Sequence, residues 1–225
     1  GEALAGKYDA VVTNPPYMSA ANMGRKLFSK VESVFSESKS DLFAVFIERA
    51  FQMSGDNGYI ALITQQVWMF ITTYKRLREK LLEYNLVNMN HLGARGFDEI
   101  SGEIVQTAAF CFRKGNILRY KSCIIRNTKG MNEKEKECDF YKHDNMYLID
   151  VGKIKHIPET PYIYWMGEAM IDTFKKGLLS DTQFPKTGVT TGDNDKYLRL
   201  WFEVENSSIH NKWFPLNKGG TYRKW

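Results

Sequence analysis

The stretch Ala10-Val11-Val12-Thr13-Asn14-Pro15-Pro16-Tyr17 joins an apolar, β-branched run directly to an Asn-Pro-Pro-aromatic tetrapeptide. The run predicts a buried strand that ends abruptly, because neither proline can donate a hydrogen bond to a sheet ladder. The prolines also stiffen the backbone and push the residue before each of them out of the helical region. The sequence therefore predicts a rigid tip that presents one amide, free carbonyls and an aromatic face. Such a tip suits a flat, nitrogen-bearing ring, although a plain strand-ending turn with a solvated tyrosine is the simpler interpretation.

Strand-like and helix-like segments alternate along the first half of the chain. Apolar runs predict strands over residues 8–13, 59–64 and 86–92. Between them, Ser40-Asp41 predicts the cap of an amphipathic helix, and residues 74–84 predict a second such helix. Continuous apolar strands separated by amphipathic helices favour a parallel α/β sheet that is covered on both faces.

Two further strand-like runs, residues 104–112 and 117–126, flank Lys114-Gly115-Asn116. A glycine-containing turn between two such runs predicts a β-hairpin. We therefore expect the sheet to close with an antiparallel hairpin.

The second half of the chain is less regular. Residues 129–142 are charged and weakly periodic, which predicts a mobile connection. Residues 164–176 predict another amphipathic helix. A turn-rich element over 188–195 then leads to a strand-like run over 197–204.

Composition narrows the class of protein. With 225 residues, of which 43% are hydrophobic, the chain can build one good core or two modest ones. The formal charge of +5 is compatible with a polyanionic partner. The three cysteines form no Cys-x-x-Cys pair, which predicts reduced thiols in a cytoplasm and no metal site. No apolar run is long enough to span a membrane, and the abrupt ends predict an internal piece of a larger protein.

Three segments together resemble a known family. The Asn14–Tyr17 tip, Asp41-Leu42-Phe43 with the helix after it, and the strand Gly58–Thr64 resemble the corresponding motifs of N6-adenine DNA methyltransferases. The likeness is greatest to the PglX type of BREX phage-exclusion systems and to fused type II restriction–modification methyltransferases. In these enzymes the catalytic domain precedes the target-recognition domain.

The resemblance extends downstream of the tip. Leu92–Phe97 resembles the segment in which a second aromatic side chain reaches the flipped base, and this gives Phe97 that role. Gly188–Leu200 resembles the start of the DNA-recognition domain. Its candidate DNA contacts are Thr191, Gly192, Asn194 and Arg199.

The resemblance implies a fold and its boundaries. Residues 1–128 would be the C-terminal half of a Rossmann-like methyltransferase sheet, with strands 4, 5, 7 and 6 of the family order 3-2-1-4-5-7-6. Residues 129–185 would be a connection with an amphipathic helix, and residues 186–225 the beginning of the target-recognition domain. Without strands 1 to 3, Tyr8–Thr13 would be an exposed edge through which the fragment self-associates.

The resemblance also implies S-adenosylmethionine as cofactor, with Asn14 at the edge of its pocket. Family members carry a glycine-rich cofactor loop and an acidic ribose-binding residue before the catalytic motif, and this sequence contains neither. We therefore expect the intact protein to use the cofactor, and this chain alone to bind it weakly or not at all and to be inactive.

The implied reaction needs two acceptors for the hydrogens of adenine N6, because the amino lone pair is delocalised into the ring. The family motif gives these roles to the Asn14 side-chain oxygen and the Pro15 carbonyl, with Pro16 stiffening the tip. The base must be rotated out of duplex DNA and would stack on Tyr17 and Phe97. The implied partners are double-stranded DNA and further phage-defence or restriction subunits, but no membrane.

Two other interpretations stay open. Methyltransferases that act on a release-factor glutamine or on a ribosomal RNA guanine share the Asn-Pro-Pro-Tyr grip on an NH2 group. They usually end soon after the closing hairpin, whereas this chain continues past Arg126, which favours DNA. A non-catalytic DNA-binding fragment is the alternative from another class.

Overall fold

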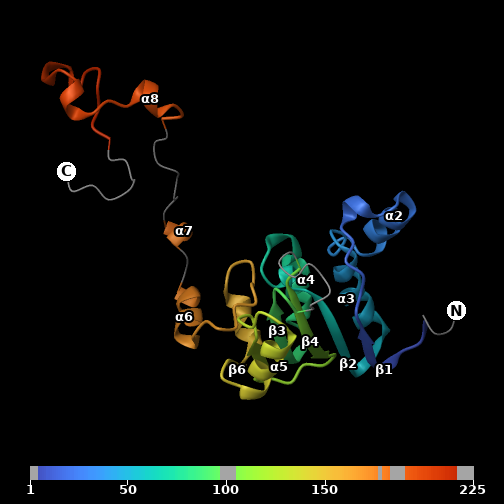
Figure 1. The fold of residues 1–225 in the computed structure, drawn as a ribbon. Coiled ribbons are helices and arrows are strands. Elements are labelled where there is room, and N and C mark those ends of the chain that lie inside the picture. Colours follow the sequence, from blue (N-terminus) through green and yellow to red (C-terminus); the bar gives the residue numbers. More distant parts are fainter. Residues whose placement is uncertain (1–4, 97–104, 177–178, 183–190, 217–225) are drawn as a thin grey trace. The chain divides into compact units, whose positions relative to one another are not determined.

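The computed structural model describes four stretches of the chain, residues 5–96, 105–176, 179–182 and 191–216 (Figure 1). The chain divides into two compact units, residues 1–177 and 178–225. The first unit contains a six-stranded sheet with the strand order β1-β2-β4-β3-β5-β6. The α/β fold class expected from the sequence is therefore confirmed.

The sheet is mixed. β1 and β2 are parallel, β3 and β5 are parallel, β4 is antiparallel to both of its neighbours, and β6 is antiparallel to β5. The first four strands have the order that the family resemblance implies, with β1 as strand 4 and β4 as strand 7. The strands are β1 (Tyr8–Thr13), β2 (Ser54–Gln65), β3 (Asn85–Gly93), β4 (Thr107–Arg113), β5 (Ser122–Arg126) and β6 (Met146–Ile149).

The expected closing hairpin is wrong. β4 lies between β2 and β3, whereas β5 pairs in parallel with β3 on its other side. Every residue of β4 is buried or half-buried, so a central position removes more apolar surface from water than a hairpin at the sheet edge would. The Lys114 N–H donates instead to the Gly58 carbonyl (2.8 Å), which ties the end of β4 to β2.

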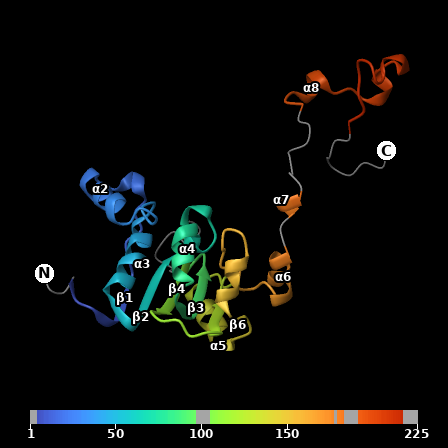
Figure 2. The same cartoon turned by 180° about the vertical axis from the view of Figure 1, so that it is seen from behind.

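The helices follow the predicted periodicity in part. The α-helices are α2 (Arg25–Val34), α3 (Leu42–Met53), α4 (Lys75–Leu81), α5 (Glu133–Lys142), α6 (Glu168–Thr173), α7 (Leu179–Thr182) and α8 (Asn194–Tyr197). The short 3-10 helices are η1 (Ala20–Asn22), η2 (Gln66–Met69), η3 (Thr72–Tyr74), η4 (Val151–His156), η5 (Phe174–Lys176), η6 (Trp201–Glu203) and η7 (Asn206–Ser208). In both views α2 and α3 lie at the β1 end of the sheet (Figures 1 and 2).

Two predicted elements are wrong. The expected mobile connection contains α5, which is attached to the sheet by polar contacts: the buried Lys136 Nζ donates to the carbonyls of Leu92 (2.7 Å) and Asn127 (3.0 Å). Because a lysine and backbone carbonyls make this attachment, the helix needs no apolar face, and the sequence shows only weak helical periodicity there. The strand-like run 197–204 contains η6, and Trp201 is 82% exposed, so its apolar residues are not paired into a sheet.

One continuous hydrophobic cluster joins the helices to the sheet. It includes Phe43 and Ile47 of α3, Leu77 of α4, and Phe110 and Phe112 of β4. The cluster extends to the segment after β6 through buried aromatic and aliphatic residues. The first unit also has a second, smaller cluster of buried residues beside α2 and α3, formed by Met23, Val31 and Val45.

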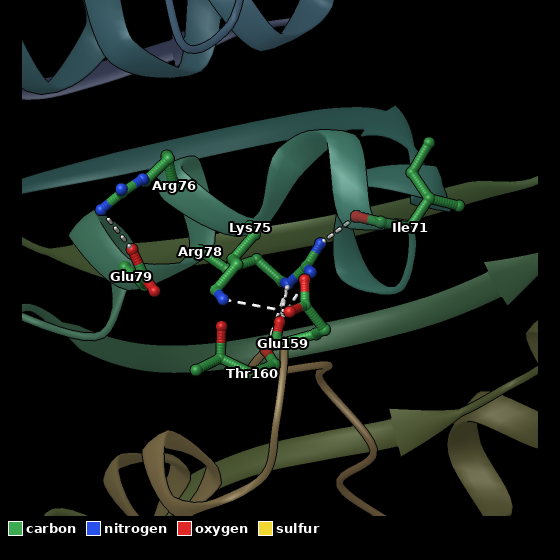
Figure 3. Close-up of polar contacts among 7 residues, drawn as sticks. All are labelled: Ile71, Lys75, Arg76, Arg78, Glu79, Glu159 and Thr160. Carbon is green, nitrogen blue, oxygen red and sulfur yellow. Dashed lines mark hydrogen bonds and ion pairs between the residues drawn. The ribbon is translucent and has the colours of Figure 1, made fainter. Parts of the chain in front are cut away.

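A buried arginine fastens the segment after η4 to this core. The Arg78 guanidinium is fully buried and donates to the carbonyls of Trp68 (2.7 Å) and Ile71 (2.7 Å). It also donates to the carbonyls of Glu159 (2.7 Å from Nη2) and Thr160 (3.1 Å from Nε) (Figure 3). Arg78 thus joins two stretches of backbone that lie more than 80 residues apart in sequence.

Candidate active site

The Asn-Pro-Pro-Tyr tip follows the carboxyl end of β1, where Thr13 pairs with Leu62 of β2. Asn14 is exposed, and its side chain has no hydrogen-bond partner in the described part of the chain. Pro15 is buried, Pro16 is exposed and Tyr17 is half-buried. The tip is therefore anchored by Pro15, while the Asn14 amide is available to a ligand.

Asp41 holds the segment that follows the tip. One oxygen of its carboxylate accepts from the Phe43 N–H (3.2 Å), which caps α3 as the sequence predicts, and from the Met18 N–H (3.1 Å). The Leu42 N–H donates back to the Met18 carbonyl (2.9 Å). A single side chain thus fixes both the start of α3 and the exit of the tip.

The Tyr17 ring is oriented by aromatic contacts. It packs edge-on against Phe43, with ring centroids 6.3 Å apart and an interplanar angle of 87°. Phe43 in turn contacts Tyr74 at 5.6 Å. Burial, with a smaller contribution from the Asp41 carboxylate, raises the pKa of Tyr17, and the same causes raise the pKa of Tyr74 to about 12. Both phenols therefore stay neutral at physiological pH.

A polar network that the sequence did not predict lies at the same edge of the sheet, where β2 and β3 end and β4 begins. His91 Nδ1 and the Tyr164 hydroxyl are 2.7 Å apart, and His91 Nε2 contacts the Gln66 side-chain oxygen. The Gln66 amide donates to the Gln106 side chain. Burial, with smaller contributions from the charges of Arg126 and Lys136, lowers the pKa of His91 to about 4.

A neutral His91 can accept a hydrogen bond from Tyr164 at Nδ1 and donate one to Gln66 from Nε2. The network therefore holds Gln66, the first residue of η2. This helix follows β2, the strand that pairs with β1. The partners in the network come from three distant segments, so no local sequence pattern could have revealed it.

The remaining predicted site residues are Phe97 and four residues of the second unit. Phe97 is outside the described residues. In the second unit Gly192 has a left-handed backbone (φ 69°), and the Thr191 hydroxyl contacts the Asn194 side chain. Arg199 donates to the carbonyls of Asp195 (2.8 Å) and Leu198 (2.6 Å). Within the described ranges, no group of three or more His, Cys, Asp or Glu side chains could hold a metal ion.

Comparison with known proteins identifies relatives. Residues 2–97, which contain the tip and α3, match the Eco57I restriction-modification methylase family. The chain is 36% identical over its whole length to "Adenine-specific methyltransferase PglX" of Lacticaseibacillus casei (strain Zhang). It is 39% identical over 99% of its length to "Adenine-specific methyltransferase BrxX" of Escherichia coli O9:H4 (strain HS).

The chain spans about a fifth of the length of these relatives, 20% and 19% respectively. Among solved structures, a nuclease-deletion mutant of the Type ISP restriction-modification enzyme LlaGI, in complex with a DNA substrate mimic, matches with a TM-score of 0.51. That match covers 72% of this chain and 18% of the other, at 15% identity, and it supports the fold.

Proposed function

We propose that this chain, whose residues 2–97 match the Eco57I restriction-modification methylase family, carries the catalytic tip of an adenine-specific DNA methyltransferase. The reaction is transfer of a methyl group from S-adenosylmethionine to N6 of an adenine flipped out of duplex DNA, in phage defence or restriction–modification. The observation that carries this proposal is the Asn14 amide, which is exposed at the carboxyl end of β1 and has no hydrogen-bond partner among the described residues. Ligands of open α/β sheets bind at this edge.

The tip has two acceptors for one amino group. The Asn14 side-chain oxygen accepts one N6 hydrogen, and the Pro15 carbonyl accepts the other. Together they draw the nitrogen lone pair out of conjugation with the ring. As the new N–C bond forms, the nitrogen becomes positively charged and increasingly acidic, so its proton leaves to solvent without a strong base. Tyr17 stacks on the extrahelical base, which is worth about 1–3 kcal/mol.

S-adenosylmethionine, when bound, would supply the electrophilic methyl group, with its S–CH3 bond breaking and S-adenosylhomocysteine leaving. Among the described residues, we assign Asn14 to the edge of its pocket. None of the 17 glycines belongs to a Gly-x-Gly sequence, so the backbone cradle that family members use for the cofactor has no counterpart here. We assign the cofactor to the complete enzyme and weak or no binding to this chain.

The proposed partners are duplex DNA and further subunits of a defence or restriction system. Residues 1–128 would form part of the catalytic domain, 129–185 a connection, and 186–225 the start of the recognition domain with Thr191, Gly192, Asn194 and Arg199 facing DNA. No helix among the described residues is long and apolar enough to cross a membrane. A cytoplasmic location agrees with a DNA substrate.

The proposal can be tested in a segment exchange. The matching fifth of E. coli BrxX is replaced by this chain, the chimera is incubated with DNA and S-adenosylmethionine, and the nucleosides are analysed by mass spectrometry. We expect N6-methyladenine from the chimera. We also expect that Asn14→Ala abolishes it while cofactor affinity changes little.

Asn22→Ala provides the matched control, because Asn22 is also an exposed amide but lies in η1, beyond the tip. It should leave methylation intact. Undiminished N6-methyladenine with Asn14→Ala would refute the assigned mechanism. Methylation of a release factor or of ribosomal RNA, and not of DNA, would refute the substrate.

A further inference from the structure

A cavity lies at the edge of the sheet opposite the tip. It encloses about 340 Å³ and is lined by Asn85 and Ser122, the first residues of β3 and β5. β1, β2, β3 and β5 run in the same direction, so Asn85 and Ser122 lie at the amino ends of their strands, whereas Asn14 follows the carboxyl end of β1. This cavity is therefore separate from the candidate active site.

The wall of the cavity is held in place by a side-chain clamp. The Asn85 side-chain oxygen accepts from the Ile117 N–H (2.6 Å), and the Asn85 amide donates to the Ile117 carbonyl (3.2 Å). The Tyr120 N–H also donates to the Ile117 carbonyl (3.3 Å), which closes a turn. The loop between β4 and β5 therefore presents a preformed surface, and a preformed site loses less entropy on binding.

The cavity is rich in positive charge. Arg119, Lys153 and Lys155 line it, and Asp150 is the only acidic residue among the described residues of its lining. The Asp150 carboxylate already accepts from the Gly152 N–H (3.0 Å), and Lys153 is paired with Glu168 (2.9 Å). The side chains of Arg119 and Lys155 have no hydrogen-bond or ion-pair partner among the described residues. Two cations are thus available to an anion.

The backbone supports a role for Arg119. Its φ of 57° is left-handed, a conformation that residues with a side chain rarely adopt and that often marks functional positions. The rest of the lining mixes apolar and aromatic side chains, among them Tyr84 and Tyr120, with polar ones, among them Asn116, Ser122 and His156. The volume lies at the small end of the range for sites that bind small molecules.

We propose that this cavity binds a phosphate group attached to a flat ring, as in a mononucleotide. Arg119 and Lys155 hold the phosphate, because guanidinium and ammonium groups both form charge-assisted hydrogen bonds to it. Tyr120, which is half-buried, contacts the ring. The phosphate comes from a free mononucleotide or from a nucleotide of a nucleic-acid strand, and the test separates these two sources.

The test is calorimetry on the whole 225-residue chain with GMP. We choose a guanine nucleotide because the Asn14–Tyr17 tip is proposed to bind adenine and should not contribute to the signal. Guanosine and inorganic phosphate serve as partial ligands. We expect GMP to bind more tightly than either. The double variant Arg119→Ala/Lys155→Ala should weaken GMP binding about ten-fold or more, since each charged hydrogen bond contributes strongly.

The matched control is Arg25→Ala/Lys30→Ala, which removes two exposed cations from α2. It should leave GMP affinity unchanged, as should Asn14→Ala. Asn14→Ala is expected to abolish the proposed methyl transfer. Unchanged GMP affinity in this variant would therefore show that the cavity can be tested independently of the proposed function. Equal binding of GMP by the double variant, or no binding at millimolar GMP, would overturn the proposal.

A short single-stranded oligodeoxynucleotide identifies the source of the phosphate. Displacement of GMP by the oligonucleotide, together with weaker oligonucleotide binding by the double variant, assigns the site to a strand. GMP binding that the oligonucleotide does not displace assigns it to free nucleotides. A poly-glutamate peptide that binds through the same two cations more tightly than GMP would overturn the nucleotide assignment in favour of an acidic segment.

Discussion

The buried side chain of Arg78 holds separate backbone segments together. Its donors face the carbonyls of Trp68, Ile71, Glu159 and Thr160, so replacing it leaves several buried acceptors unsatisfied. We expect Arg78→Met to lower the free energy of unfolding by about 3–5 kcal/mol, measured by urea denaturation.

Arg76 on the same helix supplies the control for this prediction. It is exposed and pairs with Glu79 (3.4 Å) one turn away (Figure 3). Such pairs contribute about 0.5 kcal/mol or less, so Arg76→Ala should be nearly silent. If Arg78→Met costs no more than Arg76→Ala, the carbonyl cluster does not hold these segments together.

His91 predicts a dependence of stability on pH. Burial lowers its pKa from 6.5 to about 4, with smaller effects from Arg126 and Lys136. In the unfolded chain His91 binds a proton at a higher pH than in the folded chain. The stabilisation is therefore complete above pH 6.5 and is lost as the pH falls toward about 4. The full effect is about 3 kcal/mol.

Denaturation at pH 7.5 and pH 5 measures this effect. His91→Asn should flatten the difference between the two values, whatever it does to stability at neutral pH. His210→Asn, at an exposed histidine of the second unit, should keep the wild-type difference. An unchanged difference in His91→Asn would assign the pH dependence to other groups.

Some contacts of the site residues could be predicted from the local sequence and others could not. Asp41 was predictable as a cap because a short acidic side chain directly precedes an apolar helical face. Its second bond, to the Met18 N–H, was not, because it joins residues 23 apart. The His91 network joins residues 25 and 73 apart. Local patterns report local contacts, so site residues positioned by distant partners escape them.

At the scale of elements, strands were easier to predict than their pairing. The runs over 59–64 and 86–92 lie within β2 and β3 because apolar, β-branched residues favour a buried sheet. The loop after β4 resembled a hairpin turn, yet β5 pairs with β3 instead. Pairing is decided by how much apolar surface each arrangement buries, and that depends on strands far away in sequence.

β1 is an edge strand in this chain, and its unpaired side predicts self-association. Val12 is 77% exposed, so a lysine there would place charge on the edge without disturbing the core. We expect the wild-type mass to rise with concentration in light scattering, and Val12→Lys to stay monomeric.

Leu148→Lys is the control, because Leu148 is 60% exposed on β6, the other edge of the sheet. Leu148→Lys should associate like the wild type. β6 has four residues and β1 has six, so β6 offers fewer unpaired backbone groups to a second chain. A wild-type chain that remains monomeric at high concentration would contradict the expectation for β1.

At the scale of the whole molecule, the two units differ in how many side chains they bury. Every buried core side chain described lies at or before Ile171, whereas residues 191–216 contain none that is buried. Backbone amides with so little apolar cover open readily. In hydrogen exchange on the full chain, we expect residues 191–216 to exchange orders of magnitude faster than β2 and β4. Equal protection in both regions would show that residues 191–216 are stabilised by contacts other than buried apolar side chains.

The cofactor provides the last test, because it depends on what the whole chain contains. Asn14 is the one candidate cofactor contact, and the sequence has no Gly-x-Gly cradle to bring backbone N–H groups to the ligand. A single polar contact cannot offset the entropy lost when a flexible ligand is immobilised. In calorimetry we therefore expect this chain to bind S-adenosylmethionine more weakly than about 100 μM, a free energy of about −5.5 kcal/mol. E. coli BrxX in the same buffer supplies the positive control. Micromolar binding by the 225 residues alone would mean that another part of this chain holds the cofactor, and Asn14→Ala would then show whether the tip takes part.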